Sequence, residues 1–273
     1  MYCSECHGYS LFPKLNQAQL FSLYSSDYVN QRNVEPGLSE HAKPEKFSDL
    51  DRFLTKQVGV NGKKFLDYGC GANPMSFQLA QKQGLIPHGM ELSADVREIA
   101  QRNTGVEIFS REEISRRDAE FEIIFLGDVL EHLIDPASEL EFLRTKITQQ
   151  GLLIAQGPLQ GARTLTHALV RFFALLTQKR TTVYPPYHVS LASLTSMKKL
   201  LLACGFNPTF IRTSEVDWPA PTFAELKREF NVRNSLIFAT KQVDKFLANF
   251  LPEYGTRYFL ACTPNSSPRG VVS

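Results

Sequence analysis

The sequence lacks the features that mark membrane-spanning, secreted and nucleic-acid-binding proteins. No run reaches the ~20 apolar residues that a membrane-spanning helix needs, and the most apolar stretch, Leu165–Thr177, contains Arg171. No basic region precedes an apolar run at the N-terminus, as it would in a signal peptide. The five cysteines are odd in number and widely spaced, unlike a disulfide framework. With 30 basic and 28 acidic residues, the net charge is only +2. We expect a cytoplasmic protein that inserts stably into no membrane and binds no nucleic acid.

Strand and helix patterns alternate along the first 160 residues. Short apolar runs predict strands, and apolar residues spaced by three or four predict helices. The strands are expected at residues 64–68, 87–92, 106–109, 122–126 and 151–156, and the helices at 46–58, 76–83, 94–102 and 136–146. The later part predicts helices at 164–178, 194–204 and within 222–250, and strands at 206–212 and 256–262. This order predicts a doubly wound α/β fold with a mostly parallel sheet.

A glycine-containing segment, FLDYGCGANP at Phe65–Pro74, begins within the first of these strands and continues into the turn after it. Glycines allow the backbone to turn tightly and to approach a ligand closely. The third glycine of the dinucleotide fingerprint is missing, because Pro74 takes its place, so an ordinary strand-to-helix turn is the alternative. Glu91 follows about 20 residues later, at the end of the next strand, where a carboxylate can accept both hydroxyls of a ribose. The alternative for Glu91 is an ordinary surface carboxylate.

Four motifs together resemble the class I S-adenosylmethionine (SAM)-dependent methyltransferases. They are FLDYGCGANP, HGMELS, FEIIFLGDVLEHLIDP and GLLIAQGP, in that order. The third matches the subgroup with a D-V-L-E-H-L-x-D-P signature. The resemblance covers about residues 60–160 and extends more loosely to 185–206. It implies a Rossmann-like, seven-stranded sheet with an antiparallel final pair, an N-terminal arm, helical lid insertions and SAM as cofactor.

The resemblance also implies a set of cofactor-binding residues. Asp67, Gly69 and Gly71, with Cys70 between the glycines, would line the methionine end of SAM. Glu91 would hold the ribose hydroxyls.

Further residues of the cofactor site follow from the same resemblance. Leu92 would pack against the adenine, and Gly127 and Asp128 would lie beside the methionine and the transferred methyl group. Many members carry an acidic residue for the adenine amino group after the third strand. Ser110 stands at that position here, and we expect it to bind the adenine instead.

Asp128, Glu131 and His132 have spacing that would put them on one face of a helix. They could face the acceptor, with His132 as a general base. They could instead hold Mg²⁺ or Mn²⁺, as in similar O-methyltransferases of the ubiquinone pathway and of small RNA. They could also be purely structural. His188 is the second candidate for catalysis, with loop packing as its alternative.

The N-terminal pair Cys3 and Cys6 forms a single C-x-x-C knuckle, whereas structural zinc takes four ligands. The segment resembles half of a zinc-ribbon arm found ahead of some sugar and natural-product methyltransferases. We expect no bound metal in this chain.

The predicted organisation has four parts. They are an arm and linker at 1–45, a SAM-binding core at 46–160, a lid or substrate-facing insertion at 161–193, and completion of the sheet at 194–273. We expect methyl transfer from SAM to an O, N or C atom of a small-molecule acceptor. The rivals are a nicotinamide-dependent oxidoreductase and a catalytically silent SAM-fold scaffold. The sequence specifies neither the acceptor nor the oligomeric state.

Overall fold

A computed structural model describes most of the chain. The described residues are 4–5, 8–10, 13, 15–16, 19, 44–72, 74–159, 164–177, 188–216, 222–228, 231–251 and 253–265. Cys3 and Cys6, the predicted partial zinc knuckle, lie outside them.

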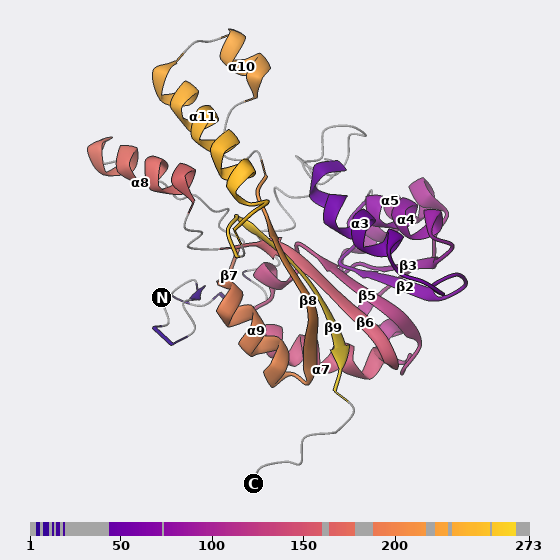
Figure 1. The fold of residues 1–273 in the computed structure, drawn as a ribbon. Helices are drawn as coiled ribbons and strands as arrows, with labels where there is room; N and C mark the ends of the chain where they lie inside the picture. The colour runs from indigo at the N-terminus through magenta and orange to yellow at the C-terminus, as the bar shows by residue number, and fades with distance from the viewer. Residues whose placement is uncertain are drawn as a thin grey trace.

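A seven-stranded sheet forms the centre of the molecule (Figure 1). Its strand order is β4-β3-β2-β5-β6-β9-β8, and β9 pairs antiparallel with both β6 and β8 while the other pairings are parallel. The strands are β2 Lys64–Tyr68, β3 Ile86–Met90, β4 Ile108–Phe109, β5 Phe121–Gly127, β6 Ile147–Pro158, β8 Phe206–Ser214 and β9 Arg257–Pro264. This confirms the predicted α/β fold and its antiparallel end.

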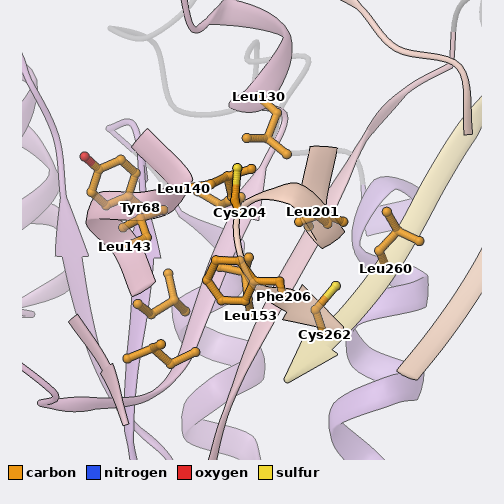
Figure 2. Close-up of a cluster of buried hydrophobic side chains, with 14 of the residues drawn as sticks. Tyr68, Leu130, Leu140, Leu143, Leu153, Leu201, Cys204, Phe206, Leu260 and Cys262 are labelled. Atoms are coloured by element: carbon orange, nitrogen blue, oxygen red, sulfur yellow. The ribbon is translucent and has the colours of Figure 1, made fainter. Parts of the chain in front are cut away.

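Helices cover both faces of the sheet. They are α3 Ser48–Thr55, α4 Met75–Lys82, α5 Ala94–Thr104, α6 Arg111–Ser115, α7 Pro136–Lys146 and α9 Leu194–Ala203. In β5, Ile123 and Phe125 pack with α3 and α4, whereas Ile124 and Leu126 pack with α7 and α9. The alternation is that of a strand buried on both sides. Figure 2 shows Leu140 and Leu143 of α7 within the second of these clusters.

Three helices extend beyond the sheet: α8 Leu165–Thr177, α10 Phe223–Arg228 and α11 Val232–Leu247 (Figure 1). They correspond to the expected helices at 164–178 and 222–250. Among the described residues, no helix combines the length and hydropathy needed to cross a membrane.

Three short elements, α6, β1 Tyr9–Ser10 and β7 Ser190–Leu191, were not expected from the sequence. The helix α6 follows β4, and β1 pairs antiparallel with β7. Boundaries also differ: the helix expected at 46–58 is α3 preceded by a 3-10 turn at Pro44–Phe47. Tyr9 and Ser10 are thus tied by backbone pairing to the segment that follows His188.

Candidate active site

The glycine loop after β2 is held against the end of β3. Gly69 and Gly71 have positive φ values of 83° and 65°, which side chains disfavour. The N–H groups of Gly69 and Cys70 donate to the Met90 carbonyl at 2.8 and 3.1 Å. A Cβ on Gly69 would lie 2.8 Å from Cγ2 of Val129, so the segment after β5 also approaches this loop closely. The two predicted glycines therefore serve a tight turn at the carboxyl edge of the sheet.

The Glu91 carboxylate is bonded to that loop. Its two oxygens accept the backbone N–H groups of Gly71 and Ser93 at 3.1 and 3.2 Å. Burial raises the pKa of Glu91, and these amide bonds oppose the rise. Arg97 donates to the carbonyls of Glu91 and Leu92, at 2.9 Å each, while the Leu92 residue is 58% exposed. The structure thus brings together Glu91 and the glycine loop and leaves an apolar side chain open beside them.

Asp67, the predicted residue at the end of β2, is buried and accepts a hydrogen bond from the Ser76 hydroxyl. Burial raises the pKa of Asp67 to about 7, the Ser76 bond opposes this, and the charge of Glu91 adds to it. Burial, and then Asp67 and Glu91, raise the pKa of the Cys70 thiol well above its ordinary value. Asp67 and Glu91 therefore lie close enough to influence each other and Cys70 electrostatically. A cationic or hydrogen-bond-donating ligand would be favoured beside them.

Ser110 has a role that the sequence did not suggest. It caps α6: its hydroxyl accepts the N–H of Glu113 at 3.2 Å, and the Glu113 carboxylate accepts the N–H of Ser110 at 2.7 Å. This reciprocal capping box fixes the turn after β4. An adenine contact for Ser110 stays a prediction.

Gly89 lies against the glycine loop, although sequence reasoning missed it. A Cβ there would lie 2.7 Å from Cδ1 of Ile108 and 2.8 Å from the Cys70 sulfur. The available signal was the position of this glycine: it lies one residue before the end of β3, and Glu91 comes directly after that strand.

Asp128, at the end of β5, is paired with Arg257 of β9. The carboxylate accepts a 2.6 Å bond from Nη2, and both side chains are largely buried. Asp128 has a positive φ of 57°, and its N–H donates to the Gln156 carbonyl at 2.9 Å. Gly127 precedes it, and a Cβ there would lie 2.6 Å from the Phe125 ring. Sequence reasoning missed Arg257, whose only signal was a basic residue at the start of a buried strand.

The expected common helix face of Asp128, Glu131 and His132 is wrong. Asp128 adopts the left-handed conformation, and only one 3-10 turn, Leu130–His132, follows it. Instead, Glu131, His132 and His188 converge, with ligand-type atoms all within 4.8 Å of one another. We call these three residues the Glu-His-His cluster. The two imidazole rings are 4.7 Å apart at 66°.

The backbone holds the cluster together, because the N–H of Val189 donates to the Glu131 carbonyl at 2.9 Å. Oε1 of Glu131 lies 3.9 Å from Nε2 of His132. Oε2 is buried and has no hydrogen-bond partner within the described part of the chain.

Burial dominates the electrostatics of the cluster. It raises the pKa of Glu131, with the Asp128 charge adding to the rise and Arg257 opposing it. Burial and the neighbouring His132 lower the pKa of His188 to about 3, so its imidazole is neutral near pH 7. One carboxylate and two imidazoles are donors that suit proton transfer or a divalent ion. Asp128, a predicted metal option, is instead engaged by Arg257.

Both groups of residues lie at one edge of the sheet. Strands β2 and β5 are parallel neighbours, with Asp67 opposite Phe125 in the register. The loops after the two strands therefore meet, as the Gly69–Val129 approach shows. In open α/β sheets, ligands bind in the crevice at this edge.

Solved methyltransferases share the fold. A SAM-dependent methyltransferase from Archaeoglobus fulgidus superposes with a TM-score of 0.52 at 17% identity, covering 81% of this chain and 93% of that one. A chain of the complex between the Haloferax volcanii Trm112 methyltransferase activator and the putative methyltransferase gives a TM-score of 0.56 at 10% identity, covering 81% and 91%.

Curated relatives match over a shorter stretch. The ubiquinone biosynthesis O-methyltransferase of Actinobacillus pleuropneumoniae serotype 5b is 28% identical over 116 residues, which is 38% of this chain and 49% of the relative. The same enzyme of Vibrio vulnificus (strain YJ016) is 31% identical over 97 residues, or 33% and 41%. The chain spans about half the length of these relatives. The family model described as a methyltransferase domain matches residues 38–209, well over half of the sequence. The chain therefore belongs to the methyltransferase-domain family.

Proposed function

We propose that this protein transfers the methyl group of SAM to a nucleophilic atom of a small molecule. The observation that carries the proposal is the Glu91 carboxylate, bonded to the Gly71 amide beside the buried Asp67. Family membership supports methyl transfer in general. The donor and the residues that would hold it are the added inference.

The cofactor side would work through fixed polar groups. A carboxylate has about four lone-pair sites, so Glu91 keeps capacity for ribose hydroxyls while it accepts the two amides. Asp67 and the Gly69–Gly71 turn would face the methionine end, where a negative charge favours an ammonium group. The open Leu92 side chain would pack on the adenine, with Ser110 nearby at the start of α6. Gly127 and Asp128 would border the methyl group, and Cys70 would line the turn.

The acceptor side would handle the proton. SAM supplies an already activated methyl group, so the protein mainly aligns the nucleophile and excludes water. His132 would take the proton of the acceptor, with the carboxyl group of Glu131 3.9 Å away from its ring nitrogen. His188, neutral near pH 7, would orient the acceptor or His132 by hydrogen bonding.

An oxygen acceptor is the first to test. The curated relatives carry the name O-methyltransferase, and a hydroxyl or phenol needs the proton removal that the cluster offers. Nitrogen and carbon nucleophiles are the remaining acceptor classes.

A divalent ion at the cluster is a second role, favoured by the orphaned Oε2 of Glu131. Glu131, His132 and His188 would be its ligands, and it would polarise a hydroxyl oxygen of the acceptor. Removal of metal with EDTA, then titration with Mn²⁺ or Zn²⁺, distinguishes the roles. Restored turnover supports the ion, and full turnover in EDTA supports the histidine as base.

Binding and transfer test the proposal in sequence. Calorimetry should detect SAM and no NAD, since the sixth position of the loop is Pro74 rather than a third glycine. Methyl-labelled SAM should then transfer label to phenols or to small molecules of a cell extract. NAD binding without SAM binding overturns the proposal in favour of an oxidoreductase. SAM binding with no labelled product from any extract overturns it in favour of a silent scaffold.

A further inference from the structure

Helices α8 and α11 form an antiparallel pair. The Asp244 carboxylate on α11 accepts the N–H groups of Leu165 and Thr166, at 2.9 and 2.8 Å, at the start of α8. Near the other end, the Arg233 guanidinium lies 5.7 Å from the centre of the Phe173 ring. The beginning of each helix is thus beside the end of the other, and Figure 1 shows both projecting from the sheet.

The two faces of α11 differ in burial. Ile237, Lys241 and Asp244 are buried against the rest of the protein. The opposite face carries an exposed apolar row with spacings of 4, 3, 4, 3 and 4 that continues into the turn after the helix: Val232, Leu236, Ala239, Val243, Phe246 and Phe250. Phe246 and Phe250 are 62% and 68% exposed. We call this row the outer seam of α11.

Helix α8 carries a similar row. Four of its exposed apolar residues have spacings of 3, 4 and 3: Leu165, Ala168, Phe172 and Leu175. Leu176, which is 64% exposed, lies beside this row and widens it. Leu175 is 78% exposed, among the most open of the large apolar side chains. Both members of the helix pair therefore show exposed apolar rows with the 3–4 spacing of packed helices.

The flanks of the α11 seam favour a helical partner over a lipid surface. A narrow row with strict 3–4 spacing is the seam of helix packing, whereas surface helices that lie in lipid have a broad apolar face edged with Lys and Arg. The flanking residues here are mostly uncharged: Ser235, Gln242 and Asn249 on one side, and Arg233, Thr240 and Leu247 on the other. Arg233 is the single charge among them.

We propose that a second copy of this chain packs on the outer seams, so that two α8–α11 pairs form a four-helix bundle about a two-fold axis. The same row on both copies is self-complementary, as such an axis requires. Charge selects an antiparallel α11–α11 contact. In a parallel one the two Arg233 residues would face each other, whereas in the antiparallel one they lie ~24 Å apart, beyond the screening length.

The test compares two double variants of the full chain by sedimentation equilibrium over a concentration series. Wild type should approach twice the chain mass of 30.8 kDa. Leu236→Glu/Val243→Glu puts charges into the seam and should weaken the dimer at least ~100-fold. The control Val58→Glu/Leu202→Glu changes side chains that are 95% and 41% exposed elsewhere, and should remain dimeric.

Circular dichroism melting of each variant reports on the fold, which solvent-exposed substitutions leave intact. A wild-type protein that stays a single chain at about 100 µM overturns the proposal, as does a seam variant that is still dimeric. A monomer that instead sediments with phosphatidylglycerol vesicles also overturns it, in favour of a lipid surface. The outcome is independent of whether SAM binds.

Discussion

The proposed cofactor side and the proposed acceptor side of the site are built in different ways. Most of the cofactor side comes from one stretch, residues 67–93, and the hydrogen bonds there run between neighbouring loops, such as the bond from the Gly71 amide to Glu91. The acceptor side joins residues far apart in the sequence: Asp128 pairs with Arg257, and His132 meets His188. Backbone amides hold the first, whereas the second is held by the buried Asp128–Arg257 ion pair and by the backbone hydrogen bond from Val189 to Glu131. The geometry of the cofactor side should therefore be less sensitive than that of the acceptor side to substitutions in other parts of the chain.

The largest effect is expected from breaking the Asp128–Arg257 pair. Arg257→Met leaves the Asp128 carboxylate buried without its cation, which should reduce the free energy of unfolding by ~3–5 kcal/mol. Urea unfolding measures it. Arg257→Met/Asp128→Asn should recover much of the loss, because no charge is then left alone. Lys198→Met, which removes an exposed pair with Glu253, should change stability by only ~0–1 kcal/mol. Equal effects of Arg257→Met and Lys198→Met would contradict the buried-charge description.

Next in size is the effect of His132→Ala on turnover. Loss of a general base should lower kcat ~100-fold or more, while the dissociation constant for SAM stays near that of wild type. Steady-state kinetics and calorimetry measure the two quantities. The control is His88→Gln. His88 lies in β3 and stacks on Phe109 of β4, so this variant should keep wild-type turnover. Full activity of His132→Ala would make His132 structural.

A smaller effect concerns pH and Asp67. Folding raises the pKa of Asp67 from 3.8 to about 7. Between these two pH values, the Asp67 carboxyl group therefore keeps a proton in the folded state that it has released in the unfolded state. The Asp67 contribution to stability is therefore lost as the pH rises from about 4 through 7. Asp67→Asn should flatten this fall between pH 5 and 8 by at least ~1 kcal/mol, the free energy of one pKa unit. Glu98→Gln, on the exposed face of α5, should keep the wild-type slope. If the stability of Asp67→Asn fell with pH as steeply as that of wild type, Asp67 would not titrate between pH 5 and 8.

The smallest effect is expected at the α6 cap. Ser110→Ala removes the hydroxyl that accepts the Glu113 amide, which should cost ~0.5–2 kcal/mol of stability. Ser110→Asp keeps a capping acceptor and should restore stability. If Ser110 also contacts adenine, the Ala variant weakens SAM binding beyond what its stability loss explains. An Ala variant as stable as wild type would contradict the capping role.

The same contrast explains what the sequence could predict. Strand and helix periodicity predicted β2 and α7 to the residue, because their neighbours in the sequence determine them. The glycine turn and the position of Glu91 beside it were also predicted, since spacing along the chain is the signal for both. The common helix face expected for Asp128, Glu131 and His132 was wrong, because Asp128 has a left-handed backbone and is held by Gln156 and Arg257, which lie on other strands. No local pattern carries that information.

Pairings between distant segments were likewise hidden. The contact of β1 with β7 involves two residues on each side, too few to leave a periodic signal. Arg257 could be suspected only as a charge beside a buried strand, and its partner was not identifiable.

The most direct test of the site is calorimetry of SAM binding to wild type, Glu91→Ala and Glu107→Ala. Loss of the Glu91 carboxylate should weaken SAM binding by ~1–3 kcal/mol, about 5- to 150-fold. The Glu107 side chain is 60% exposed, and its removal should leave the affinity unchanged. Wild-type affinity in a folded Glu91→Ala variant would contradict a donor site built on Glu91 and the glycine loop.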